Sequence, residues 1–348
     1  MADERAPDVP AALRWLPLLP WQRPAAVAAL AQRSTWPHAL LIHGRGGIGK
    51  HALALNLAQA LLCESPSADG LPCGQCPSCC YAVAGQHPDL LRLELIEIDD
   101  EDGEPKPVDT IAISRVRALI DFVQLTSHRQ RAKVAVIAPA ERMTPQAANA
   151  LLKTLEEPPA GTYLILVTDQ SGRLPATILS RCRRLAAPQP GPDEACAWLA
   201  AQGVPEPRLA LAQAGGAPLR ALELADPEWQ SERRAWLAAL AQPQRLSVIA
   251  LAARIEAGAR EGRRARLARA VDWLLAWTAD LARVAAGGAA LQNPDFAPHL
   301  GELAGGLAPI AAFRYHRSLL RQRALLVHPL QPRLVAEAML IDYRALFR

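Results

Sequence analysis

Apolar runs of strand length alternate with helical segments through the first half of the chain. The runs are ALLIHG (39–44), LLRLELIEI (90–98), KVAVIA (133–138) and TYLILVT (162–168). Helical patterns lie between them at 50–62, at 114–125 with Ser114 as N-cap, and at 144–157 with Thr144 as N-cap. Residues 174–184 are expected to form a short helix or turn. Strands that alternate with helices predict a parallel sheet covered on both faces, the α/β class.

The second half of the chain carries a different pattern. Residues 186–194 (AAPQPGPDE) have the proline and glycine density of a linker, and no strand pattern follows them. Residues 193–225 predict two or three short helices, and the chain from about 229 onward is helical throughout. One helical stripe consists of Leu267, Val271, Leu274, Thr278 and Leu281. The fold class is therefore α/β followed by all-α, divided at residue 187 and again at residue 228.

Composition supports this division and narrows the function classes. A chain of 348 residues, 51% of them hydrophobic, has material for two or three packed domains. The net charge of +4, from 38 basic and 34 acidic residues, is too balanced for a dedicated nucleic-acid-binding protein. No apolar stretch reaches the ~18 residues of a membrane span, and residues 1–10 lack the apolar core of a signal peptide. A cytoplasmic protein is expected.

A glycine-rich turn joins the first predicted strand to the first predicted helix. Residues 44–51 read G-R-G-G-I-G-K-H and match the phosphate-loop pattern G-x-x-x-x-G-K at Gly44, Gly49 and Lys50. In such a loop, backbone N–H groups surround phosphate oxygens and the lysine adds a positive charge. The order strand, loop, helix predicts a phosphate-loop domain.

Two parts of a nucleotide-hydrolysing site are missing. The hydroxyl residue that binds magnesium after the lysine is replaced by His51, and imidazole is a poor ligand for this oxygen-preferring ion. The strand 133–138 ends in Ala138-Pro139 instead of an acidic pair that holds magnesium and orients water. A surface or capping role is expected for the nearest acid, Glu141. We interpret the loop as degenerate and without hydrolysis, and whether it still binds ATP is left open.

Five of the seven cysteines lie between Cys63 and Cys80. Cys73, Cys76 and Cys79 follow one another at x2 spacing, and Cys63 at the end of the preceding helix is the predicted fourth ligand. Four thiolates suit zinc in a closed, structural site. Cys80 and His87 are rival ligands, and spacing alone does not distinguish an iron–sulfur cluster. Residues 63–89 are therefore predicted to form a zinc-bearing insertion.

Further motifs resemble the bacterial clamp-loader family, which is of the AAA+ type. They are PWQRP (20–24), HALLIHG (38–44), GQHPD (85–89) after the cysteines, NALLKTLEEPP (149–159) and Ser-Arg-Cys (180–182). The resemblance is dense from about 15 to 188 and rests beyond that on helical character and Gly-Gly-x-Pro-x-Arg (215–220). It implies an AAA+-like domain over 1–187 with the zinc module at 63–89. It also implies a small helical lid over 188–228 and a helical collar over 229–348 that joins the subunits.

The resemblance also implies roles for particular residues. In this family, the arginine of Ser-Arg-Cys acts in trans on the ATP of the adjacent subunit, and Arg181 has that position. A guanidinium suits the task because it stays charged and binds phosphate oxygens in pairs. The departures at His51 and Ala138-Pro139 match the non-hydrolysing subunit of the loader rather than its motor subunit.

The implied partners are the motor subunits (gamma or tau) and the delta subunit in a hetero-oligomer. Through the assembled loader, they include the sliding clamp and primed DNA. The chain would then be part of the DNA polymerase III holoenzyme without ATPase or polymerase chemistry of its own.

Two rival hypotheses stay open. An active clamp-loader ATPase would hydrolyse ATP with Lys50. A zinc-module DNA-binding protein would bind DNA strongly as an isolated chain, with a steep dependence on salt. Arg220 is a candidate for nucleotide sensing and the basic run 261–270 for DNA contact, although a solvated helix face also explains the run.

Overall fold

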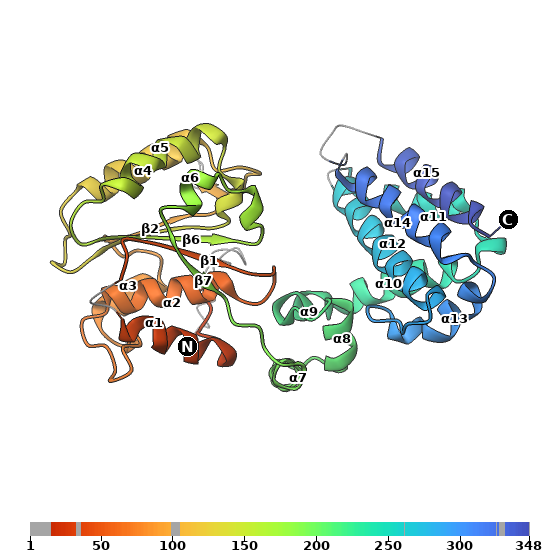
Figure 1. The fold of residues 1–348 in the computed structure, drawn as a ribbon, viewed down its shortest axis with the longest axis horizontal. Helices are drawn as coiled ribbons and strands as arrows, with labels where there is room; N and C mark the ends of the chain where they lie inside the picture. The colour runs from red at the N-terminus through yellow and green to blue at the C-terminus, as the bar shows by residue number, and fades with distance from the viewer. Residues whose placement is uncertain are drawn as a thin grey trace, which may run out of the picture. The chain divides into compact units, whose positions relative to one another are not determined.

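The computed structural model describes residues 15–32, 36–98, 105–260, 262–324, 326 and 331–347. The chain divides into two compact units, residues 1–190 and residues 191–348 (Figure 1). The sequence predicts that residues 1–10 are not a signal peptide. These residues lie outside the described part of the chain. Within the described ranges, no helix has the length and apolar character that crossing a membrane requires.

A five-stranded sheet forms the centre of the first unit. Its strand order is β2 (Leu90–Leu93), β5 (Lys133–Ile137), β6 (Thr162–Thr168), β1 (Ala39–His43) and β7 (Arg183–Ala186). Every neighbouring pair in this sheet is parallel, which confirms the predicted α/β class. The carboxyl ends of β1 and β6 lie side by side, with His43 opposite Thr168.

Helices cover both faces of this sheet (Figure 1). One face carries α1 (Arg23–Ala31), α2 (Lys50–Leu62) and α3 (Pro77–Val83), and the other carries α4 (Ile113–Gln124), α5 (Pro145–Glu156) and α6 (Ala176–Leu179). Alternate residues of β1 enter different cores because strand side chains alternate between faces. Leu40 and Ile42 pack with α2, whereas Ala39 and Leu41 pack on the side of α4 and α5.

Several boundaries differ from the sequence prediction. The run 90–98 is not one strand, because β2 ends at Leu93 and β3 (Ile96–Ile98) pairs antiparallel with β4 (Pro105–Pro107) in a separate sheet. The segment 174–184 forms α6 and then the start of β7, an edge strand whose exposed arginines hide its pattern. The N-cap of α4 is Ala112 rather than Ser114. The predicted N-cap Thr144 of α5 is confirmed by its hydrogen bond from the N–H of Ala147.

The described part of the second unit is helical, as predicted. Its helices are α7 (Pro192–Ala201), α8 (Pro207–Gln213), α9 (Pro218–Leu224), α10 (Pro227–Leu240), α11 (Val248–Ala253), α12 (Arg263–Ala285), α13 (Ala297–Gly305), α14 (Pro309–Ala324) and α15 (Pro332–Ala345). The predicted stripe on α12, from Leu267 to Leu281, is buried. Helices α7–α9 and α10–α15 form separate hydrophobic cores, and Trp229 packs against both. The division into lid and collar stays a prediction.

Candidate functional site

The glycine-rich loop connects β1 to α2. Gly44, Gly47 and Gly49 have φ angles of 153°, 75° and 94°, in the region that favours glycine. A Cβ on Gly49 would lie 2.3 Å from Cδ1 of Leu19 and 2.5 Å from Nε2 of Gln22. The buried Gln22 amide donates a hydrogen bond to the Gly49 carbonyl at 2.7 Å. The loop thus depends on its glycines for its backbone course, and the segment before α1 holds it from outside.

Lys50, the first residue of α2, is turned into the protein. Its side chain is 3% exposed, and Nζ lies 2.6 Å from Oδ1 of Asp169, which directly follows β6. Nζ also donates to the carbonyl of Arg45 at 2.5 Å. An unpaired ammonium at this depth would be costly, and the Asp169 carboxylate offsets that cost. The lysine of the loop is therefore paired with an anion of its own chain.

His51 also has an internal partner. Its Nε2 lies 3.1 Å from Oε1 of Glu94, and Nε of Arg92 donates to the same oxygen at 2.6 Å. Burial acts to raise the pKa of Glu94, but His51 and Arg92 outweigh it and hold that pKa below its ordinary value. The position of a hydroxyl ligand for magnesium is taken by a cluster of imidazole, carboxylate and guanidinium.

The carboxyl end of β5 leads into Ala138-Pro139 and a short 3-10 helix, Ala140–Arg142. Oε1 of Glu141 on this helix accepts a hydrogen bond from the backbone N–H of Asp169 at 3.0 Å. The acid nearest to the expected catalytic position therefore fixes the backbone of Asp169. Asp169 precedes Gln170, the N-cap of the 3-10 helix Ser171–Arg173, so Glu141 does not cap that helix through this contact.

The four cysteines proposed as zinc ligands lie together. The Sγ atoms of Cys63, Cys73, Cys76 and Cys79 are all within 4.8 Å of one another. Cys63 to Cys76 and Cys73 to Cys79 are each 3.9 Å apart, close to the ~3.8 Å that a tetrahedron of ~2.3 Å Zn–S bonds requires. The donor set and its spacing fit one tetrahedral metal ion. Such an ion would cross-link the end of α2 to the start of α3.

A metal ion bound at this cluster would have to displace the protons of its buried thiols. The N–H groups of Gln75 and Cys76 donate to Sγ of Cys73 and lower its pKa to about 6. Burial raises the pKa of the Cys63 and Cys79 thiols. Without a positive charge the buried pair stays protonated at neutral pH, whereas a divalent metal supplies the charge that lets all four ionise.

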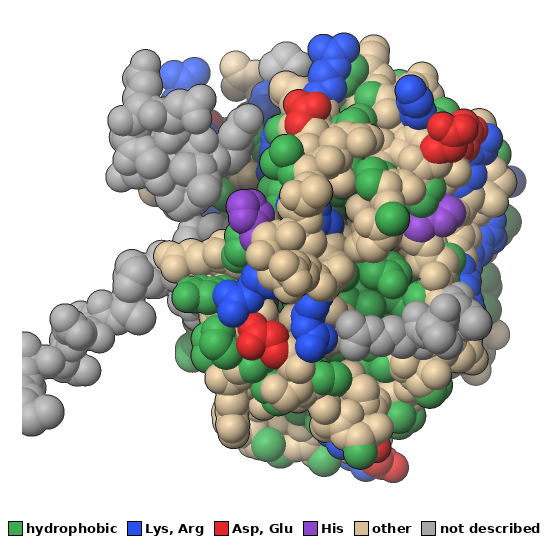
Figure 2. All heavy atoms as spheres, turned by 90° about the vertical axis from the view of Figure 1, so that its left-hand side faces the viewer, with side chains coloured by type: hydrophobic (Ala, Val, Ile, Leu, Met, Phe, Trp, Pro, Cys, Tyr) green, Lys and Arg blue, Asp and Glu red, His purple; other side chains and the backbone are tan. Residues whose placement is uncertain are grey.

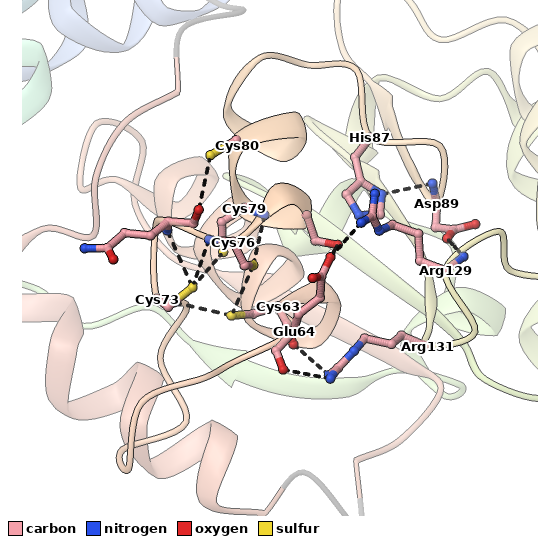
Figure 3. Close-up of polar contacts among 12 residues, drawn as sticks. Cys63, Glu64, Cys73, Cys76, Cys79, Cys80, His87, Asp89, Arg129 and Arg131 are labelled. Carbon is pink, nitrogen blue, oxygen red and sulfur yellow. Dashed lines mark hydrogen bonds and ion pairs between the residues drawn. The ribbon is translucent and has the colours of Figure 1, made fainter.

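Figure 3 shows that the two alternative ligands, Cys80 and His87, lie outside the four-cysteine cluster. Cys80 points away from the cluster and donates to the carbonyl of Gln75 at 3.7 Å. The Nδ1 atom of His87 accepts a hydrogen bond from the N–H of Asp89 at 3.0 Å. Among the described residues, the one group with ligand atoms in reach of a shared metal contains neither of them. The geometry favours Cys79 over its neighbour Cys80 as a ligand beside Cys63, Cys73 and Cys76.

Two arginines of the loop between α4 and β5 contact the segment that follows α2 (Figure 3). Arg131 donates to the carbonyls of Cys63 and Glu64 at 2.7 and 2.8 Å, and Arg129 lies 2.9 Å from Oε1 of Glu64. The thirteen-residue α2 separates the start of the phosphate loop's helix from Cys63 by about 20 Å. The cluster therefore supports the fold at a distance from Lys50.

Arg181 lies in the turn between α6 and β7. Its side chain is 33% exposed, and Nε donates to Oε1 of Glu156 at 2.8 Å. Nη1 donates to the carbonyl of Thr177 at 2.9 Å and to Oγ of Ser180 at 3.2 Å. Glu156 ends α5 and is itself 49% exposed. Exposed ion pairs stabilise by only ~0–1 kcal/mol, so the guanidinium can exchange this carboxylate for a phosphate at low cost.

The residues that follow Arg181 have other surroundings. Cys182 is buried in the core beside α4 and α5, and burial raises its pKa to about 11. Arg183 and Arg184 belong to β7, and Nη2 of Arg183 donates to Oε1 of Gln32 at 2.6 Å. Arg183 is therefore already engaged with Gln32, outside the turn that carries Arg181.

The chain is similar to replication proteins over most of its length. The family model described as "DNA polymerase III, delta subunit" matches residues 25–190. DNA polymerase III subunit delta prime of Pseudomonas aeruginosa is 44% identical over 211 residues, 60% of this chain and 61% of that protein. Its Escherichia coli counterpart is 32% identical over 306 residues, 85% of each chain. The chain belongs to the delta prime family of DNA polymerase III. The resemblance to clamp-loader proteins is thereby confirmed.

The delta prime match extends further than the match to another clamp-loader subunit. DNA polymerase III subunit tau of Escherichia coli is 39% identical over 145 residues, which is 42% of this chain and 20% of tau. The longer alignment with delta prime covers regions that the tau alignment does not reach. Family membership therefore rests on more than the part that the two subunits share.

Two candidates in the second unit of this delta prime family member have internal partners. Nη2 of Arg220 lies 3.6 Å from Oδ2 of Asp272. Within the described part of the basic run, Arg266 donates to the carbonyls of Ile255 and Ala259 at 2.9 and 2.7 Å. Residue 261, the first of the run, lies outside the described residues. These contacts favour a structural interpretation of the run.

Sequence reasoning about this delta prime family member does not single out Asp169, Glu94 or Gln22. For Asp169 a signal exists, because an acid directly after the strand 162–168 lies at the same sheet edge as the loop. The phosphate-loop pattern instead predicts an acidic residue at the end of the strand 133–138. Glu94 is hidden inside a run that resembles one continuous strand. Gln22 lies in the motif PWQRP (20–24), which gives no sign of its contact with the loop.

Proposed function

We propose that this chain is the non-hydrolysing delta prime subunit of a cytoplasmic bacterial clamp loader. It presents Arg181 in trans to the ATP of an adjacent gamma or tau motor subunit. With the delta subunit, it helps to hold the assembly that places the sliding clamp on primed DNA. One contrast carries the proposal: Lys50 is buried against Asp169, whereas Arg181 lies at the surface beside the exposed Glu156.

The surroundings of the loop argue against hydrolysis by this chain. Hydrolysis needs a lysine that meets the phosphates, an oxygen ligand for magnesium and an acid or amide that orients water. Lys50 is paired with Asp169, His51 with Glu94, and Glu141 with the backbone of Asp169. Each group that remains near the loop is thus already used within the chain.

The hydrogen bonds of Arg181 suit a group that acts on a neighbour. Nη1 is held by Thr177 and Ser180, while Nε and Nη2 both contact Glu156. Nε and Nη2 form the edge of a guanidinium that binds two oxygens of a phosphate or carboxylate side-on. In the assembled loader, the same edge would stabilise negative charge on the transferred phosphoryl group.

The four-cysteine cluster has a structural role in this proposal. Bound zinc would use Cys63, Cys73, Cys76 and Cys79 as its complete set of ligands, so that no coordination position is left for a substrate. The ion would hold the segment between α2 and α3 against the sheet, where Arg129 and Arg131 already contact it.

Reconstitution with motor and delta subunits tests the proposal. ATP hydrolysis is measured with clamp and primed DNA for the unmodified chain, Arg181→Ala and the matched control Arg183→Ala. A trans-acting arginine contributes on the order of 10³-fold or more to phosphoryl transfer, so Arg181→Ala should abolish turnover at the site it serves. The Arg183→Ala loader should retain full activity, because Arg183 contacts Gln32 of its own chain.

Sedimentation of the reconstituted mixture shows whether each variant assembles. An assembled Arg181→Ala loader with undiminished turnover at every site would refute the trans-acting role. The motor-subunit hypothesis predicts instead that the isolated chain hydrolyses ATP and that Lys50→Ala abolishes this activity.

The face drawn in Figure 2 gives the DNA-binding hypothesis no concentrated basic patch. At the end of the first unit seen in Figure 2, basic side chains are interspersed with acidic and apolar ones rather than gathered in one patch. Strong binding of primed DNA by the isolated chain, with a steep decrease in added salt, would nevertheless favour that hypothesis.

A further inference from the structure

The Asp169 carboxylate lies where a phosphate loop receives an anion. Its Oδ1 is 2.6 Å from Nζ of Lys50, and a Cβ on Gly46 would meet its Oδ2 at 2.9 Å. Gly46 therefore leaves the space that the carboxylate occupies, and a side chain at this position would collide with it. The acid thus contacts the lysine and lies beside the glycine-rich turn.

The sheet places Asp169 at this position. Strand β6 lies next to β1 with Thr168 opposite His43, so the residue after β6 emerges beside the start of the loop. Glu141 then accepts the N–H of Asp169 at 3.0 Å, which fixes the direction of the backbone there. Two acids from neighbouring strand ends therefore act in series: Glu141 holds Asp169, and Asp169 holds Lys50.

This arrangement opposes the binding of a second anion. A bound phosphate would compete with Asp169 for the ammonium of Lys50 and would experience repulsion from the displaced carboxylate at short range. The internal carboxylate is present at high effective concentration because the fold tethers it. Lys50 is 3% exposed, whereas Asp169 is 50% exposed, so the acid closes the solvent side of the pair.

We propose that Asp169 is an internal substitute for phosphate and that its neutralisation uncovers a binding site for the triphosphate group of a nucleotide. The glycine-rich loop is then a complete anion site that the chain itself occupies. This inference concerns the chain's own loop and does not depend on the role proposed for Arg181. Its test uses the isolated full chain and leaves Arg181 unchanged, so each proposal can fail without the other.

Calorimetric titration of the zinc-loaded chain with ATP, and separately with inorganic tripolyphosphate, tests the inference. The variants are Asp169→Asn, the double variant Asp169→Asn/Lys50→Ala, and Asp193→Asn as a matched loss of an exposed carboxylate in the second unit. We expect Asp169→Asn to bind ATP at least tenfold more tightly than the unmodified chain. The double variant should lose this gain, and Asp193→Asn should equal the unmodified chain.

Comparison of ATP with tripolyphosphate shows whether the site recognises the whole nucleotide or only its phosphates. A clear preference of Asp169→Asn for ATP over tripolyphosphate identifies a nucleotide site, and equal binding identifies a site for polyphosphate alone. Both outcomes support an uncovered anion site. The inference is overturned when Asp169→Asn binds neither ligand more tightly than the unmodified chain does, or when the double variant keeps the gain.

A second variant keeps the test decisive when Asp169→Asn folds poorly. Glu141→Gln leaves Asp169 in place but weakens the contact that fixes its backbone, so a smaller gain in ATP affinity is expected. A folded Glu141→Gln chain whose affinity equals that of the unmodified chain would contradict the role of Glu141 in holding Asp169. Circular dichroism of each variant before titration establishes that it is folded.

Discussion

Lys50 and Arg181 are two cations of one domain that meet their anions in opposite ways. Lys50 is almost fully buried and paired with Asp169 across the end of the sheet, whereas Arg181 is paired in solvent with Glu156 at a helix end. The first pair lies beside the glycine-rich loop, and the second lies in a turn between a helix and a strand. The two acids are about equally exposed, so the comparison teaches that availability to a ligand depends on how deeply the cation itself is buried, not on the motif alone.

Metal removal is expected to have the largest effect on stability. It also tests whether the contrast between Lys50 and Arg181 depends on the cysteine segment. Structural zinc sites in small modules contribute about 10–16 kcal/mol to folding of the module. Cys76→Ser should therefore release zinc and expose the amides of 63–89 to hydrogen exchange. Far-UV helicity should be largely retained, because the sheet and α2 have their own core.

Cys80→Ser is the matched control for this change, because Cys80 contacts only a backbone carbonyl in the cluster region shown in Figure 3. It should retain one zinc per chain in elemental analysis. Loss of zinc from Cys80→Ser with retention in Cys76→Ser would mean that the ligand set is wrong. Loss of all helical signal on zinc removal would mean that the metal supports the whole domain.

Asp89 provides a fully buried carboxylate against which the Lys50 pair can be compared. It accepts hydrogen bonds from Ser127, His128 and Arg129 at 2.9–3.0 Å. Asp89→Asn should lower the free energy of unfolding by about 2–4 kcal/mol, because buried donors lose a charged acceptor. Urea denaturation at pH 7 measures this change, and a loss below 0.5 kcal/mol, on the order of an exposed ion pair, would contradict the burial argument.

The same carboxylate predicts how acid affects stability. Burial acts to raise the pKa of Asp89, but its hydrogen bonds outweigh burial and hold the pKa below its ordinary value. The unfolded chain therefore binds the proton first, near its ordinary pKa of ~4, and acid favours unfolding. The stabilisation is complete above about pH 5 and is lost as the pH falls through the lower pKa of the folded state. Asp89→Asn should flatten this part of the stability profile.

The two ion pairs should differ in their effect on stability. Asp169→Asn leaves Lys50 buried beside a neutral group and should cost about 1–2 kcal/mol, a figure discounted because Asp169 is half exposed. Glu156→Gln breaks an exposed pair and should cost ~0–1 kcal/mol. Urea midpoints of the two variants compare them directly. An equal decrease in the free energy of unfolding, or a larger decrease for Glu156→Gln, would contradict the distinction between buried Lys50 and available Arg181.

The elements whose pattern depends only on residues adjacent in sequence are predicted well. Helix 50–62 and strand 162–168 were predicted with the bounds that the structure shows, because their apolar runs and flanking turns are uninterrupted. The start of β7 was assigned to a helix or turn, since an edge strand buries little and Arg183 and Arg184 are exposed. Glu94 interrupts the apolar run 90–98, and its carboxylate contacts His51. Local sequence does not indicate this contact.

The candidate site likewise contains residues that local sequence predicts and residues that it does not predict. The cysteine spacing predicts the cluster because its ligands are close in sequence, and Cys63 lies at the end of the adjoining helix. The partner of Lys50 comes from a residue 119 positions later, and only the order of strands in the sheet brings Asp169 to it. Contacts of this kind need the register of the sheet before they can be predicted.

One assay compares the two cations directly. Loaders are reconstituted with Lys50→Ala and, separately, with Arg181→Ala, and ATP turnover is measured with clamp and primed DNA under saturating ATP. The account predicts that Lys50→Ala leaves turnover unchanged, while Arg181→Ala removes the contribution of the site it serves. The opposite pattern, with turnover lost in Lys50→Ala and kept in Arg181→Ala, would contradict it.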